Sequence, residues 1–222
     1  MTITTERPAR PPVHPELDGA PVVALPRRKI DSFLIAFGVV LTAALVVAGA
    51  LLSWGAGFSD DYVGDELASQ NITFPPADAL REEGRGDLAK FGGQKLDTGR
   101  EAEAYASFIG GHLEKIAGGL TYAELGVPET AAKDAVVAAQ EAGASEAEIA
   151  ELQAKADGIT GQRNTLFKGE TLRGLLLTAF AWSTVGTIAG YAAIGAFSAA
   201  AVMLVLVVLG LLHIRKNKEL RL

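Results

Sequence analysis

Hydrophobic residues are concentrated in two long stretches of the sequence that contain no charged side chain. The first runs from Phe33 to Trp54, and the second runs from Gly174 to Leu212. A helix needs about 20 apolar residues to cross the roughly 30 Å hydrocarbon core of a bilayer. Both stretches reach that length. The pattern therefore predicts an integral membrane protein, with residues 30–54 forming the first transmembrane helix. We expect that helix to continue outward through Val63 and Leu67.

The second stretch is too long for a single crossing. A helix over 174–212 would measure about 58 Å at 1.5 Å per residue. We favour one transmembrane helix over 191–212, preceded by an apolar juxtamembrane helix over 171–190. Two short spans in 174–212 would also fit the length, but they would place the basic C-terminal tail on the outer side of the membrane.

The polar region between the two stretches has the pattern of an all-α domain. Three Ser or Thr residues precede a Glu by three positions, which is the capping-box spacing at helix starts. They are Thr98, Thr121 and Ser145. Apolar side chains recur at helical spacing along 102–116 and 149–166. We expect these two helices to pack antiparallel, with the alanine-rich helix at 128–140 between them, as a bundle or stalk flanked by the two transmembrane helices.

Charge divides the chain into the same regions and suggests its topology. The net charge is −6, but residues 55–173 carry 21 acids and 11 bases, while the remaining residues carry 5 acids and 9 bases. Lys and Arg next to a span stay on the cytoplasmic side. We therefore expect a multi-pass protein of the cell membrane with both termini in the cytoplasm. Residues 55–170 would form an acidic extracytoplasmic domain, and 213–222 a basic cytoplasmic tail.

The first 29 residues contain six prolines and few large apolar side chains. Such a segment cannot bury enough surface to fold alone, so we expect a disordered cytoplasmic tail over 1–29. The chain has no cysteine, which excludes disulfides, thiolate metal sites and a cysteine nucleophile.

An acidic cluster follows the first predicted span and consists of Asp60, Asp61, Asp65 and Glu66. Carboxylates are ligands for hard divalent cations, so the cluster is a candidate cation site. A solvated acidic surface next to the membrane explains the same residues, and we favour that reading because cation sites usually use a tighter ligand loop.

Small residues in the apolar stretches suggest close helix packing. Gly186 and Gly190 form a small-xxx-small pair, and Ala44 and Ala48 offer a small face on the first span. Small side chains let transmembrane helices approach closely. The two helices could therefore pack on each other or on neighbouring proteins.

No catalytic or cofactor motif stands out. The three histidines are His14, His112 and His213, and the expected topology places His112 outside and the other two inside. They cannot converge on one metal, and no zinc-binding spacing is present. We predict no metal, no cofactor and no nucleic-acid partner.

Three segments resemble a family of uncharacterised actinobacterial two-span membrane proteins. They are 66–76 (ELASQNITFPP), 102–113 (AEAYASFIGGHL) and 160–174 (TGQRNTLFKGETLRG). The resemblance runs from about residue 30 to residue 213. Some members of that family carry an aromatic ring-opening dioxygenase label. Such enzymes hold iron with histidines and a carboxylate, whereas the histidines of this chain are expected on opposite sides of a membrane.

Two functional hypotheses follow. The first is a non-enzymatic membrane protein that presents its external helical domain as an accessory or scaffold subunit. Its partners would be the lipid bilayer and another membrane protein or a second copy of itself. The second is a small-ligand sensor or enzyme, with a site between the external helices. Convergent carboxylates with a raised pKa in a pocket would favour the second hypothesis, and an exposed apolar face on the external helices would favour the first.

Overall fold

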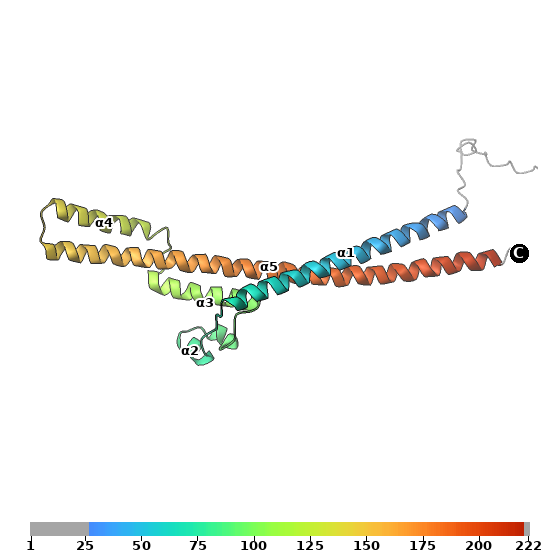
Figure 1. Cartoon of the computed structure of the whole chain (residues 1–222), viewed down its shortest axis with the longest axis horizontal. Coiled ribbons are helices and arrows are strands. Elements are labelled where there is room, and N and C mark those ends of the chain that lie inside the picture. Colours follow the sequence, from blue (N-terminus) through green and yellow to red (C-terminus); the bar gives the residue numbers. More distant parts are fainter. Residues whose placement is uncertain (1–26, 220–222) are drawn as a thin grey trace, which may run out of the picture. The chain divides into compact units, whose positions relative to one another are not determined.

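The computed structural model describes residues 27–219 and confirms an all-α chain (Figure 1). Over this range there is no strand, and the β-type pairing is a single antiparallel bridge between Thr73 and Lys95. The elements, in chain order, are α1 (Arg27–Ser69), α2 (Ala77–Glu82), the 3-10 helix η1 (Gly86–Phe91), α3 (Gly99–Ala117), α4 (Gly126–Glu141) and α5 (Glu146–Glu219). The predicted tail over 1–29 lies almost entirely outside the described residues.

Two helices, α1 and α5, are long and apolar enough to cross a membrane. Both continue well beyond the predicted spans. The first helix extends past Trp54 to Ser69, as expected from the apolar positions Val63 and Leu67. The second is one unbroken helix of 74 residues. The alternative of a two-span hairpin within 174–212 is therefore wrong, because no turn interrupts α5 there.

Contacts divide the chain into two units, which we describe separately. One comprises residues 27–43 and 201–219, and the other comprises residues 44–200. In the larger unit, α1 and α5 pack antiparallel through small residues. A Cβ atom added at Gly186 would lie 2.8 Å from Ser59 Cβ, and one added at Gly49 would lie 2.9 Å from the ring of Phe197. The Ser59 hydroxyl also donates a 2.8 Å hydrogen bond to the carbonyl of Trp182.

The largest apolar core lies where the C-terminal end of α1 meets α2, η1 and α3. Leu80 and Leu96 are fully buried in it, and Phe74 is 2% exposed. Phe74 stacks on Phe91 and contacts the edge of Tyr105. Leu176 of α5 belongs to the same cluster. The apolar segment at the start of the charge-free stretch therefore packs partly against the polar domain.

Helices α3 and α4 pack against successive lengths of α5 (Figure 1). Leu113 of α3 packs with Leu166, as the antiparallel prediction required. Val136 of α4 packs with Ala156, nearer the start of α5. The expectation that α4 lies between the other two helices is wrong. The alanine-rich α4 buries only one narrow face, and α5 is long enough to provide separate surfaces for both helices.

All three predicted capping residues make capping contacts. Thr98 forms a complete capping box with Glu101 at the start of α3. Thr121 makes the reciprocal bonds with Glu124 in the turn that precedes α4, and the Ser145 hydroxyl accepts a bond from the Glu148 backbone N–H in α5. These bonds satisfy backbone groups that a helix start leaves free.

Candidate functional site

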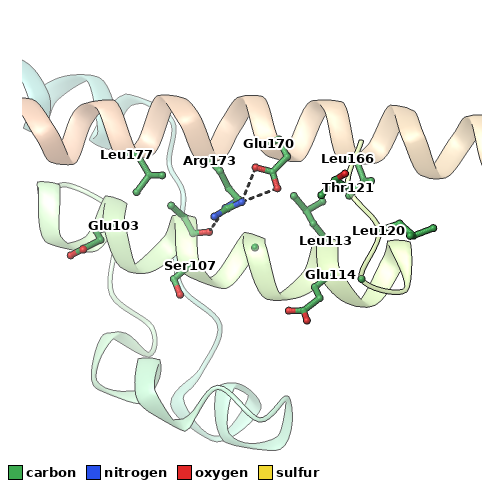
Figure 2. Close-up of a pocket in the computed structure, with 13 residues that line it drawn as sticks. Glu103, Ser107, Leu113, Glu114, Leu120, Thr121, Leu166, Glu170, Arg173 and Leu177 are labelled. Carbon is green, nitrogen blue, oxygen red and sulfur yellow. Dashed lines mark hydrogen bonds and ion pairs between the residues drawn. The ribbon is translucent and has the colours of Figure 1, made fainter. Parts of the chain in front are cut away.

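A groove with a volume of about 490 Å³ lies between α3 and α5 in the larger unit (Figure 2). Leucine side chains from both helices line it, including Leu113, Leu166 and Leu177. Its polar groups include Glu170 and Arg173 of α5. The groove is thus open and lined by both apolar and charged side chains, and its volume falls within the range of small-ligand sites.

Arg173 crosses the groove and binds the backbone of α3. Its Nε donates to the carbonyl of Ala106 at 3.2 Å, and its Nη1 bonds both carboxylate oxygens of Glu170 at 2.7 Å. Gly110 makes this possible, because a Cβ atom there would lie 3.1 Å from Arg173 Nε. The guanidinium charge is therefore neutralised by its neighbour on the same helix and serves to hold α5 onto α3.

A second arginine, Arg85, also binds the backbone of α3, on another face of that helix. Arg85 Nη1 donates to the carbonyl of Ser107 at 2.8 Å, and a Cβ atom at Gly111 would lie 3.2 Å from that nitrogen. Asp87 binds the guanidinium through Nε and Nη2, raising the pKa of Arg85 and lowering its own. The adjacent glycines Gly110 and Gly111 thus form two notches, one for each arginine.

Sequence analysis missed these notches. The available signal was a pair of glycines in the middle of an otherwise regular apolar helix pattern. Glycine costs up to about 1 kcal/mol relative to alanine in a helix, so two in succession indicate that something approaches the backbone closely. Nothing in the spacing identified arginines as the groups that approach.

His112 lies in a neighbouring groove of about 520 Å³ beside α3. Its ring contacts Phe108 at a centroid distance of 4.6 Å, and its Nε2 lies 3.5 Å from a carboxylate oxygen of Glu83. Its Nδ1 is 3.3 Å from the Phe108 carbonyl. Its side chain is 46% exposed, so the ring is half-buried and packed against Phe108.

Glu129 holds α4 against α5. Its side chain is only 8% exposed and accepts bonds from Lys133, Thr160 and Arg163 at 2.7, 2.9 and 2.6 Å. These donors lower the pKa of Glu129 from 4.5 to about 2, with the Lys133 bond the largest cause. Arg163 also lies 4.3 Å from the ring centroid of Tyr122, so one arginine links α5, α4 and the preceding turn.

The candidate cation ligands Asp60, Asp61, Asp65 and Glu66 are all exposed on the C-terminal part of α1. Among the side chains that the structure describes, residues 29–216, there is no group of three His, Asp or Glu that could hold a metal ion. Asp61 and Asp65 share one face of the helix, but no loop folds the four carboxylates around a common centre.

The predicted small faces divide into two groups. Gly186 packs against Ser59, and a Cβ atom at Gly190 would lie 3.8 Å from Ala56 Cβ. Ala44 and Ala48 are exposed instead. Packing of α1 against α5 therefore uses other small residues of α1, and a role of the two alanines toward a neighbouring protein stays a prediction.

Carboxylates with raised pKa values do not converge in either groove. Among the described residues, a raised carboxyl pKa is resolved at Asp97, which lies outside both. The carboxylate of Glu101 binds the Asp97 backbone N–H at 3.0 Å as part of the α3 cap. Its proximity raises the pKa of the Asp97 side chain. This shift is a by-product of helix capping rather than a sign of general acid–base chemistry.

Comparisons with known proteins show no match to any family model, to any curated protein or to any solved structure. The family resemblance noted from the sequence therefore remains a prediction, and function has to be argued from the molecule itself.

Proposed function

We propose that this chain is a non-enzymatic integral membrane protein, in which α1 and α5 cross the bilayer and hold an acidic helical domain outside the cell. In this role it serves as an accessory or scaffold subunit of a membrane complex. The proposal includes cytoplasmic termini and an extracytoplasmic position for the domain over 55–170.

The exposure of apolar side chains along both long helices carries the proposal. In the most apolar 18-residue windows of α1 and α5, only 11% and 17% of residues are buried. Leu51 and Trp54 of α1 are 64% and 71% exposed, and Ile194 of α5 is 64% exposed. A soluble helix of this composition would be buried on most sides. A surrounding hydrocarbon phase satisfies these side chains, while Gly49, Ser59 and Gly186 face the partner helix.

Three features support an accessory role. The domain has three small core clusters rather than one large one. The groove arginine is already neutralised within the protein, by Glu170. Large apolar side chains are exposed on α5 within its charge-free stretch but before the predicted span, including Leu175 at 63% and Trp182 at 61%. Exposed apolar surface of this kind is typical of interaction sites.

A ligand-binding role is the alternative, and the α3–α5 groove is the feature that favours it. Its leucines and carboxylates would suit an amphipathic cation. The paired state of Arg173 and Glu170 weakens this alternative, because a ligand would have to displace one of them from the other.

Cysteine labelling tests the proposed topology, and the absence of native cysteine makes it a clean measurement. We would introduce Ser145→Cys in the α4–α5 turn and, separately, Asn217→Cys near the C-terminus. In intact cells a membrane-impermeant maleimide should label the first variant and not the second, and alkaline carbonate should extract neither. If only Asn217→Cys were labelled, the topology would be the reverse of the one proposed. Extraction of the protein by carbonate would refute the membrane assignment.

Affinity purification from mild-detergent extracts tests the accessory role. Stoichiometric co-purification of the same membrane protein from independent preparations is the expected result. A homogeneous preparation without a protein partner, but with a small molecule bound to the domain, would favour the ligand-binding role. The α3–α5 groove would then be the first place to look for the bound molecule.

A further inference from the structure

The smaller unit, residues 27–43 with 201–219, contains a groove of about 500 Å³ between the start of α1 and the end of α5. Its lining is apolar over most of its length, and includes Leu34, Gly38, Met203, Leu206 and Gly210. From residue 203 to residue 214 it follows about 17 Å of helix. The end of the groove nearest the start of α1 and the end of α5, which we call its mouth, is polar because Asp31 and His213 line it.

Two glycines create this groove by bringing the helix backbones together. A Cβ atom at Gly38 would lie 2.7 Å from Val207 Cγ2, and one at Gly210 would lie 3.2 Å from Ile35 Cγ1. The larger side chains are pushed to the rim, where Leu206 is 56% exposed. The result is an apolar groove that is open along its side, hereafter the channel, a shape that suits an extended hydrocarbon chain.

Basic residues gather beside the mouth of the groove. Lys29, Arg215 and Lys216 are exposed, and within the described part of the chain none of them forms an ion pair. The sequence from 27 to 31 and from 213 to 222 contains 7 bases and 2 acids. Along the two helices, Lys29, Arg215 and Lys216 thus lie within about one turn of Asp31 or Ile214, the lining residues nearest the helix ends.

We propose that this groove binds a phospholipid with a net negative headgroup. One acyl chain lies in the channel between α1 and α5, and the headgroup phosphate contacts Lys29, Arg215 and Lys216. The inference rests on the proposed membrane function. Basic residues immediately beyond a span attract anionic headgroups, and here the adjacent channel adds a site for the chain. A zwitterionic lipid fits the channel equally well but lacks the net charge.

Asp31 gives the proposal a second, opposite test. It lines the mouth of the groove together with His213. Its carboxylate opposes an anionic headgroup, whereas the three bases attract one. Neutralising the bases must therefore weaken retention of the anionic lipid, and neutralising Asp31 must strengthen it. A nonspecific loss of protein integrity would not produce changes of opposite sign.

The experiment uses the full chain purified in detergent and exposed to equal amounts of phosphatidylglycerol and phosphatidylcholine. Native mass spectrometry then counts the lipids that remain bound. The variant is Arg215→Gln/Lys216→Gln, and its matched control is Arg100→Gln/Lys168→Gln, which removes two exposed bases from the larger unit. Each neutralised base near the mouth should lower the preference for phosphatidylglycerol by about fivefold.

The expected result is preferential retention of phosphatidylglycerol, unchanged in the control, reduced in the Arg215/Lys216 variant and increased in Asp31→Asn. Inorganic phosphate should not displace the lipid, because it cannot occupy the channel. Equal retention of both lipids by a carbonate-resistant protein would overturn this inference while leaving the membrane function intact. A protein that carbonate extracts would overturn both.

Discussion

The packing of α1 on α5 makes a distance-specific prediction about a disulfide. The wild-type chain has no cysteine, so Ala56→Cys/Gly190→Cys would introduce the only pair. A Cβ atom at Gly190 would lie 3.8 Å from that of Ala56, and disulfides need about 3.5–4.5 Å. The bond should therefore form under mild oxidation of membranes, within one polypeptide.

The magnitude follows from the loop that the bond closes. The loop contains about 135 residues, for which the chain-entropy relation gives at most about 5 kcal/mol of stabilisation. The crosslink joins α1 to α5 about one helical turn from the Ser59–Gly186 contact. The oxidised variant should therefore unfold at a higher temperature than the reduced variant in the same detergent.

Ala48→Cys/Gly190→Cys is the matched control for the crosslink. Ala48 lies two helical turns, about 12 Å, from Ala56 along α1, and it is exposed. The assay is a maleimide–polymer gel shift after oxidation, which detects any thiol left free. Crosslinking of the control pair, with free thiols in the Ala56/Gly190 pair, would show that the register of α1 against α5 is wrong.

Three further predictions concern the larger unit. Leu80→Ala should lower the free energy of unfolding by about 2–5 kcal/mol because the side chain is fully buried; Leu175→Ala, at an exposed site, should leave the thermal midpoint nearly unchanged. Gly99→Ala should destabilise by about 1–3 kcal/mol, because the new Cβ atom would overlap Ser183, and an added Ser183→Gly change should restore the midpoint. Glu129→Gln should lower the midpoint at neutral pH. The charge of Glu129 stabilises the fold above pH 4.5, and this contribution is lost as the pH falls toward about 2. The variant and wild-type midpoints should therefore converge over that interval, and a constant difference would contradict the assignment.

Local signals predicted individual helices well. The capping spacing located the start of α3, where Thr98 and Glu101 make both bonds of the box. The apolar positions Val63 and Leu67 correctly extended α1 beyond the charge-free stretch, since both are buried in the main core. These successes share a cause, because helix ends and amphipathic spacing depend on residues a few positions apart.

Arrangements that depend on a partner far away in the sequence were not predicted. Ala44 and Ala48 have the small side chains that helix packing favours, but they are exposed, and Gly49 and Ala56 face α5 instead. Alanines and glycines occur on several faces of this helix, so composition alone does not show which face packs against α5. The one that is used depends on the rotation of α1 about its axis, which is set by contacts with α5 beyond the span.

The position of α4 shows why the sequence of α5 is hard to interpret as a single amphipathic helix. Its most buried positions recur every ten residues at Ala156, Leu166, Leu176 and Gly186, and then after seven at Ala193. Ten residues of an α-helix fall about 80° short of three full turns. The buried face therefore moves around α5 as its partner changes from α4 to α3 and then to α1. Each partner needs only a short apolar patch, so no stripe persists along the helix. A periodicity analysis finds the helix but cannot separate its three partners, and for that reason it placed α4 between α3 and α5 rather than on a separate length of α5.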